Sequence, residues 1–256
     1  MSAIGVTPAR VLRSEWIKLA SLRSVKLTFL AAAAGMVAFG VLVSWVSVHD
    51  WPRMTPADRA DVAVEEVTLA GRYFAQLAVG VVGVIAISGE YATGMIRATL
   101  AAVPRRLPVL WAKLGLFAAV TLALTTVASF AAFFAGNAIL AEHWDFHLSG
   151  PGVLRSVLGT AGGLTAVCLL GTALGGILRN TAAALSTLFC ILMVLPLAAE
   201  FIPQIGPYLP TGAIGSLATA RIEGAMLEPL PALLLLCGYV VAAIGGAAFT
   251  LLRKDA

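Results

Sequence analysis

The residues best suited to act on a partner lie in one basic segment, GEYATGMIRATLAAVPRRLPVLWAK, which spans residues 89–113. The segment follows one uncharged run, precedes another, and holds a single acid, Glu90, together with four basic residues. This composition is typical of an amphipathic, positively charged turnaround. Such a segment is suited to docking a soluble protein.

Part of this segment has helical periodicity. On a helix over residues 92–103, Ile96, Leu100 and Val103 form an apolar stripe, while Thr93 and Arg97 point elsewhere. A short amphipathic helix of this kind could carry motion between a soluble partner and the helices on either side. We expect Glu90 to cap its first turn or to pair with Arg97. The alternative is a basic loop that only sets membrane topology.

Catalytic and metal-binding patterns are weak. None of the four lysines follows the Gly-rich turn of a phosphate-binding loop, and there is no His-Glu-x-x-His helix or Ser/Lys dyad. His143 and His147 stand four residues apart beside Glu142 and Asp145, a spacing that is compatible with a metal but is better explained by a solvated polar cap. We therefore predict no catalytic residue, no metal and no cofactor on this chain.

The elements that must position the segment are membrane helices. Apolar residues make up 60% of the chain and charged residues only 12%, in six uncharged runs of roughly spanning length. Because lipid offers the backbone no hydrogen-bond partner and the runs do not alternate, the sequence predicts an all-α integral membrane protein with six transmembrane helices in one domain, residues 1–256. The expected spans are residues 27–48, 69–89, 114–141, 156–178, 180–200 and 229–252. Arg72 should snorkel toward the head groups where the second helix extends past its lipid-buried part.

Basic residues set the orientation. With both termini in the cytoplasm, 12 of the 17 lysines and arginines lie on the inner side. The same arrangement places residues 90–113 of the basic segment in the cytoplasm and residues 201–228 outside. The basic sequence pI then reflects topology and anionic membrane lipid, so no nucleic acid partner is expected.

The N-terminal segment, residues 7–26, has the pattern of an interfacial helix. Thr7 and Pro8 are suited to an N-cap and a first turn, and Leu12, Trp16 and Leu19 share one face of the helix. We expect this face to lie on the inner leaflet. An ordinary basic flank that only sets topology is the alternative.

Several smaller features belong to the outer side and to the helix contacts. Residues 57–66 are expected to form a short helix, and the prolines of residues 201–228 exclude one continuous helix there. Pro196 and Glu200 mark the approach to this outer cap, where they are candidates for a pathway or outer gate; a snorkelling carboxylate is the alternative for Glu200. The glycine pairs Gly80/Gly83 and Gly171/Gly175 are typical of closely approaching helices.

The basic segment resembles the first cytoplasmic loop of bacterial type-2 ATP-binding cassette (ABC) exporter permeases. That loop carries Glu-Tyr or Glu-Arg, then Gly-Thr, a basic residue, a leucine and Pro-x-Arg before the next helix. The corresponding residues here are Glu90, Tyr91, Gly94, Arg97, Leu100, Pro104, Arg105 and Arg106, with Met95 in place of the threonine. The N-terminal RSEWIKL helix, the span count and the long outer segment extend the resemblance over essentially the whole chain.

The resemblance implies a non-catalytic permease subunit of a bacterial cytoplasmic membrane. Its short cytoplasmic coupling helix would dock on a separate ABC ATPase, which would hold the ATP and Mg²⁺. A second copy of this chain, or a similar permease, would complete the pathway for an amphipathic cargo. Two other classes stay open: a six-span interaction or immunity protein, and an ion-driven secondary transporter, which the lack of a mid-span acid disfavours.

Overall fold

The computed structural model describes residues 7–102, 106–144, 147–222 and 224–253, and the regular structure within these ranges is helical. The elements are α1 (Pro8–Ser21), α2 (Arg23–Asp50), η1 (Trp51–Arg53), α3 (Pro56–Asp61), α4 (Val64–Thr68), α5 (Arg72–Ala92), α6 (Met95–Ala102), α7 (Arg106–Leu140), α8 (Val153–Leu178), α9 (Thr181–Phe189), η2 (Cys190–Val194), α10 (Leu195–Ala199), η3 (Gly206–Tyr208), α11 (Pro210–Ala218) and α12 (Pro229–Arg253).

Six helical segments within the described ranges are long and apolar enough to cross a membrane, which confirms the predicted number of spans. They are α2 with η1, α5, α7, α8, the run from α9 to α10, and α12. A multi-pass membrane protein is the class of protein that they indicate. Outward-facing apolar side chains on α2 and α12, such as Leu30, Phe39, Leu234 and Val241, are exposed, as lipid contact requires.

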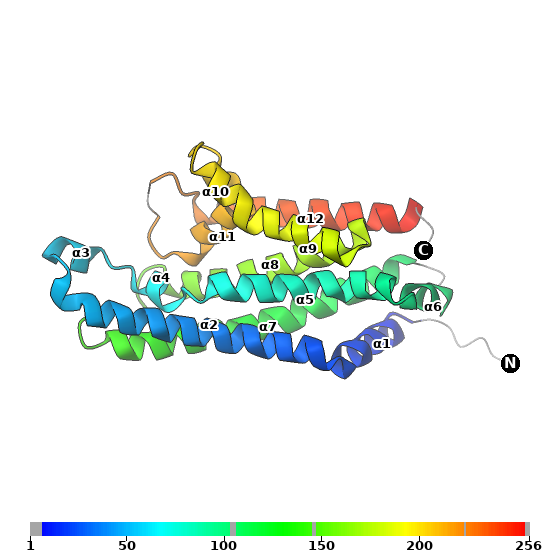
Figure 1. Ribbon diagram of the computed structural model, residues 1–256, viewed down its shortest axis with the longest axis horizontal. Coiled ribbons are helices and arrows are strands. Elements are labelled where there is room, and N and C mark those ends of the chain that lie inside the picture. The colour runs from blue at the N-terminus through cyan, green and yellow to red at the C-terminus, as the bar shows by residue number, and fades with distance from the viewer. Residues whose placement is uncertain (1–6, 103–105, 145–146, 223, 254–256) are drawn as a thin grey trace.

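The helices run along one long axis, with distinct elements at the two ends (Figure 1). One end, here called the α6 end, carries α1, α6 and the last turns of α12. The opposite end, the α3 end, carries α3, α4, α10 and α11. The segments predicted to face the cytoplasm and those predicted to face outside are therefore separated along the molecule.

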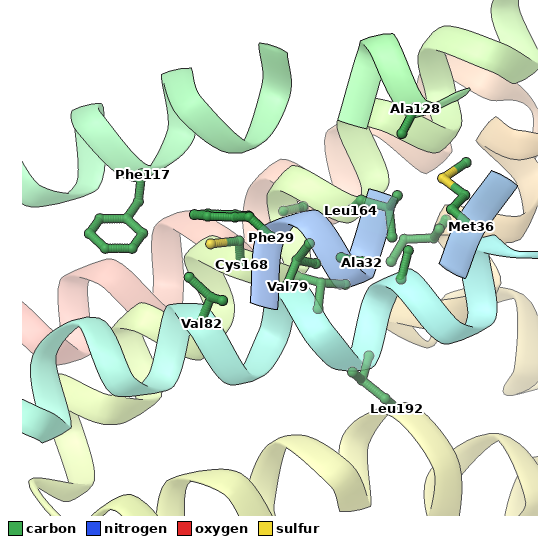
Figure 2. Packing of buried hydrophobic residues seen from close by; sticks show 14 of the residues in the cluster. Phe29, Ala32, Met36, Val79, Val82, Phe117, Ala128, Leu164, Cys168 and Leu192 are labelled. Carbon is green, nitrogen blue, oxygen red and sulfur yellow. The ribbon is translucent and has the colours of Figure 1, made fainter. Parts of the chain in front are cut away.

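Helix α8 is the most buried of the six spans and packs against α5, α7, α11 and α12. Figure 2 shows how side chains from several spans meet in the core, among them Phe29 of α2, Val79 of α5, Phe117 of α7 and Leu164 of α8. Helices α5 and α8 approach closely through the predicted glycine pairs. A Cβ atom added to Gly171 would lie 2.6 Å from the carbonyl oxygen of Gly80. This contact places the two backbones against each other.

Several boundaries differ from the predicted ones. Helix α7 begins at Arg106 rather than at residue 114, so the last part of the expected loop is helical. The helix expected over residues 57–66 is divided into α3 and α4, because Val62 and Ala63 are extended. Helix α5 begins at Arg72, and the predicted snorkelling of this side chain is wrong: Arg72 is only 8% exposed and lies inside the protein.

The N-terminal helix is also shorter than expected and differently rotated. It ends at Ser21, where an extended Leu22 separates it from α2. Of the three residues expected on one lipid-facing side, Leu12 and Trp16 are exposed, whereas Leu19 is buried against the bundle. Helix α1 turns both Glu15 and Leu19 toward the other helices. The spacing of apolar residues in the sequence does not reveal this rotation.

The fifth span is irregular. Its middle, η2, is a single stretch of π-helix, and Pro196 follows in α10. Proline has no backbone N–H and its ring crowds the carbonyl four residues earlier, which here belongs to Leu192 within η2. The wider π turn accommodates this conflict, and such turns are frequent at functional sites.

Candidate functional site

Four charged side chains, three of them buried and one partly buried, meet at the α6 end and form a closed ring of ion pairs. Lys18 Nζ lies 2.7 Å from Glu15 Oε1 and 3.0 Å from Glu90 Oε1. Lys113 Nζ lies 2.8 Å from Glu90 Oε1 and also donates a hydrogen bond to Glu15 Oε2. Two acids and two lysines thus alternate, and the ring carries no net charge. We call these four residues the ion-pair ring.

Each member of the ring comes from an element that the sequence positions in a simple way. Glu15 and Lys18 stand three residues apart on α1, which places them on the same helical face. Glu90 lies in the last turn of α5, and Lys113 lies two turns into α7. The ring therefore joins the N-terminal helix to the ends of two membrane spans.

Burial gives these contacts their strength. The side chains of Glu15, Glu90 and Lys113 are between 2% and 6% exposed, and that of Lys18 is 23% exposed. Burial by itself lowers the pKa of Lys18, but its hydrogen bonds to Glu15 and Glu90 outweigh this and raise the pKa above its ordinary value of 10.5. Removing one member of such a buried set leaves its partner's charge uncompensated, which is strongly destabilising.

Helix α6 is tied to the ring by one further contact. Besides its two bonds to the acids, Lys18 Nζ donates a third hydrogen bond, to the hydroxyl oxygen of Thr99 on α6, over 3.2 Å. On the same short helix Ile96 is buried, whereas Met95, Arg97 and Ala98 are exposed. The helix thus has one face anchored to the bundle and another face open to a partner.

The turn between α5 and α6 depends on Gly94. Its φ angle is +72°, a left-handed conformation that costs other residues energy because of their Cβ atoms. Thr93 ends α5 and its hydroxyl donates a hydrogen bond to the carbonyl of Gly89. This turn lets the chain leave α5 and start α6 at once.

The remaining predicted coupling residues fall into three groups. Arg106 donates a hydrogen bond to the carbonyl oxygen of Leu251 at 3.0 Å, near the C-terminal end of α12, where a cation is favourable. Tyr91 is partly buried and lies 5.0 Å beneath the guanidinium of Arg179. Pro104, Arg105 and the side chain of Leu100 lie outside the described residues, as does Val103 of the expected stripe.

The expected pairing of Glu90 with Arg97 is wrong. Glu90 instead accepts hydrogen bonds from Lys18 and Lys113, and Arg97 is exposed. The physical reason is burial. Since the Glu90 carboxylate faces the bundle interior, its partners are the cations of neighbouring helices rather than a side chain on the outer face of α6.

Residues of the α3 end that the sequence singled out occupy different places. Pro196 and Glu200 line a cavity between α5, α8, α10 and α11. His143 stacks on Trp51 with ring centroids 4.5 Å apart. Within the described ranges, no three His, Cys, Asp or Glu side chains gather as a metal site would require.

Sequence reasoning did not identify Glu15, Lys18, Lys113 or Thr99 as parts of the site. One signal was available: Glu15 is the only acid before Asp50, and Glu90 is the only acid between Glu66 and Glu142. A lone acid at the end of an apolar run is expected to pair with a cation, because an unpaired charge at the edge of the lipid is costly. Which lysine each acid meets depends on helix packing.

No protein-family model matches this chain, and no curated protein matches it.

Proposed function

We propose that this chain is the membrane-spanning subunit of an ABC exporter, which forms the translocation pathway and couples to a separate ATPase. The observation that carries the proposal is the link from α6 to the ion-pair ring. An exposed amphipathic helix at one end of the bundle is bonded, through Thr99 and Lys18, to charges held by α1, α5 and α7.

This geometry suits mechanical coupling. A partner that pushes or pulls α6 acts through the short Gly94 turn on α5 and through Lys18 on α1. The closed ring then passes the displacement to α7 through Lys113. Because the ring is buried and its charges are matched, the span ends should move together rather than separate.

The bias of basic residues supports a cytoplasmic position for the α6 end in a bacterial cytoplasmic membrane. ATP and Mg²⁺ would then belong to the partner ATPase, and this chain would bind no cofactor and catalyse no reaction. Two copies, or this chain with a similar permease, would enclose the pathway. Membrane lipid surrounds them, and no nucleic acid takes part.

Co-expression with a candidate partner ABC ATPase tests the proposal. The charge reversal Arg97→Glu alters the exposed face of α6, and Arg53→Glu is the matched control at the α3 end, where the Arg53 side chain is 77% exposed. We expect Arg97→Glu to lower ATPase co-purification about tenfold or more, as the loss of a central charged contact does, while Arg53→Glu leaves it unchanged. Undiminished co-purification and transport by a correctly inserted Arg97→Glu variant would refute docking through this face.

The energy source separates this proposal from the other two classes. In vesicles that contain both subunits, ATP-dependent export is expected, and it should persist when an ionophore removes ion gradients. Transport that the ionophore abolishes would indicate a secondary transporter instead. An interaction or immunity protein would bind its partner without moving any cargo.

A further inference from the structure

A second site lies at the α3 end, far along the molecule from the ion-pair ring. It is a cavity of about 280 Å³ between α5, α8, the irregular fifth span and α11. Its polar lining includes Arg72, Gln76, Thr160 and Glu200. Most other lining residues are apolar: Leu164, Val167, Leu192, Met193, Leu197 and Ile214.

Arg72 is the unusual member of this lining. The residue is 8% exposed, its Nη2 donates a hydrogen bond to the Tyr73 hydroxyl at 3.0 Å, and its guanidinium lies 4.6 Å from the centre of the Tyr73 ring. Its Nη1 is buried and has no hydrogen-bond acceptor. Among the residues that the structure describes, no acid forms an ion pair with Arg72. A buried cation with an unused donor is costly unless an acceptor is supplied.

Two other polar groups are close at hand. The hydroxyl oxygen of Thr160, on α8, is buried and also lacks a hydrogen-bond partner. Gln76, one turn after Arg72 on α5, is 5% exposed and lines the same cavity. Together they offer a positive charge and neutral hydrogen-bonding groups to one small volume, an arrangement that suits an oxyanion.

We propose that this cavity binds the oxyanion head group, carboxylate or phosphodiester, of an amphiphile that enters from the lipid. Arg72 pairs with the oxyanion, the Thr160 hydroxyl donates a hydrogen bond to it, and the apolar wall contacts the start of the alkyl chain. Arg72 Nη1 and Thr160 Oγ1 are both buried, so binding includes rotamer changes of these two side chains, which are common at binding interfaces.

An amphiphile is favoured over a free anion for two reasons. The cavity lies between the ends of predicted spans, and the wall formed by η2 and α10 carries outward-facing exposed residues such as Leu195 and Leu197. An alkyl chain gains by contact with these surfaces, whereas a free anion gains nothing from them. The Glu200 carboxylate is exposed where it lines the cavity and would repel a second negative charge. The head group should therefore carry one charge.

This inference does not rest on the proposed export function, because binding requires no ATPase. If the chain is an exporter, the site also indicates that its cargo is an anionic amphiphile. Failure of ATPase docking through α6 would leave the binding site standing, and failure of binding would leave the docking proposal standing.

The test uses the purified full chain in a neutral detergent and a diazirine derivative of dodecanoate, which carries one negative charge, as a photoaffinity probe. We expect labelling of peptides from the fifth span or α11, and competition by dodecanoate and by dodecyl methyl phosphate, a phosphodiester with one negative charge. Dodecanol, which has no charge, tests whether the anionic head group is needed. Inorganic phosphate, which has no alkyl chain, tests whether the alkyl chain is needed. Neither compound should compete with the probe. Equal competition by dodecanol or by inorganic phosphate would overturn the proposal.

Substitutions test the roles of the residues. Arg72→Gln should lower the specific labelling about tenfold or more, as expected for the loss of charge-assisted hydrogen bonds, whereas the matched outer-side control Arg53→Gln should not. Thr160→Val has almost the same shape and covers the case in which Arg72→Gln fails to fold; it should also weaken labelling. Glu200→Gln should strengthen it. Unchanged labelling in folded Arg72→Gln, or in Thr160→Val where Arg72→Gln does not fold, would overturn the proposal.

Discussion

Replacing Glu90 by glutamine should destabilise the protein by disturbing the ion-pair ring while keeping its shape. The Glu90 side chain is 6% exposed and accepts hydrogen bonds at 3.0 Å from Lys18 and 2.8 Å from Lys113. The neutral amide leaves the ring with a net charge of +1. Breaking a buried pair costs about 3–5 kcal/mol. Since Lys18 is partly exposed and both lysines keep Glu15, we expect the lower limit, about 3 kcal/mol.

Thermal unfolding in detergent, followed by helical circular dichroism, measures this loss. For a chain of this size about 3 kcal/mol corresponds to a fall in the melting temperature of roughly 6–12 °C. The matched control is Asp50→Asn, which removes the exposed Arg53–Asp50 pair at 3.1 Å. Exposed pairs contribute about 0–1 kcal/mol, so this variant should unfold close to the wild-type temperature.

A double-mutant cycle with Lys113→Met tests the ring itself. Lys113→Met alone leaves the two acids facing one lysine, and combined with Glu90→Gln it restores a neutral pair, Glu15 and Lys18. The double variant should therefore lose less stability than the sum of the single losses, by about 1 kcal/mol or more. Strict additivity, or a Glu90→Gln variant as stable as Asp50→Asn, would refute the reasoning.

Three further predictions concern the helix contacts and the ring. Gly171→Ala should cost about 1–3 kcal/mol, because its Cβ would meet the Gly80 carbonyl 2.6 Å away; Gly162→Ala on the same helix has open space and should be near neutral in a melting experiment. Gly94→Ala should cost about 1–2 kcal/mol, because alanine resists a φ of +72°; an unchanged melting temperature would contradict a left-handed turn. The ring raises the pKa of Lys18 above 10.5. The contribution of Lys18 to the free energy of unfolding is therefore complete below that pH and is lost as the pH rises through the higher pKa of the folded state. The melting-temperature difference between wild type and Lys18→Met should accordingly be constant at lower pH and shrink above about pH 10.5, and a difference that grows there would contradict this sign.

Much of the architecture follows from the sequence alone. Long uncharged runs must be helical in lipid, because each backbone N–H and C=O group has to find its partner within the segment. The number of spans is a local consequence of residue type, and so is the short helix expected over residues 92–103, which is observed as α6 (Met95–Ala102). The glycine pairs mark faces suited to close approach, but they do not say which helix each face meets. The prolines after Glu200 likewise predict the broken segment that leads to α11.

The partners of the charges were decided only by the tertiary structure. Periodicity places Leu12, Trp16 and Leu19 on one stripe of α1, but the helix also turns Glu15 inward because Lys113 lies opposite it. Arg72 likewise looks like a head-group anchor in the sequence and is enclosed by neighbouring helices in the fold. Charge pairing depends on distances of a few ångströms between segments far apart in the chain, and hydrophobic patterning carries no information about those distances.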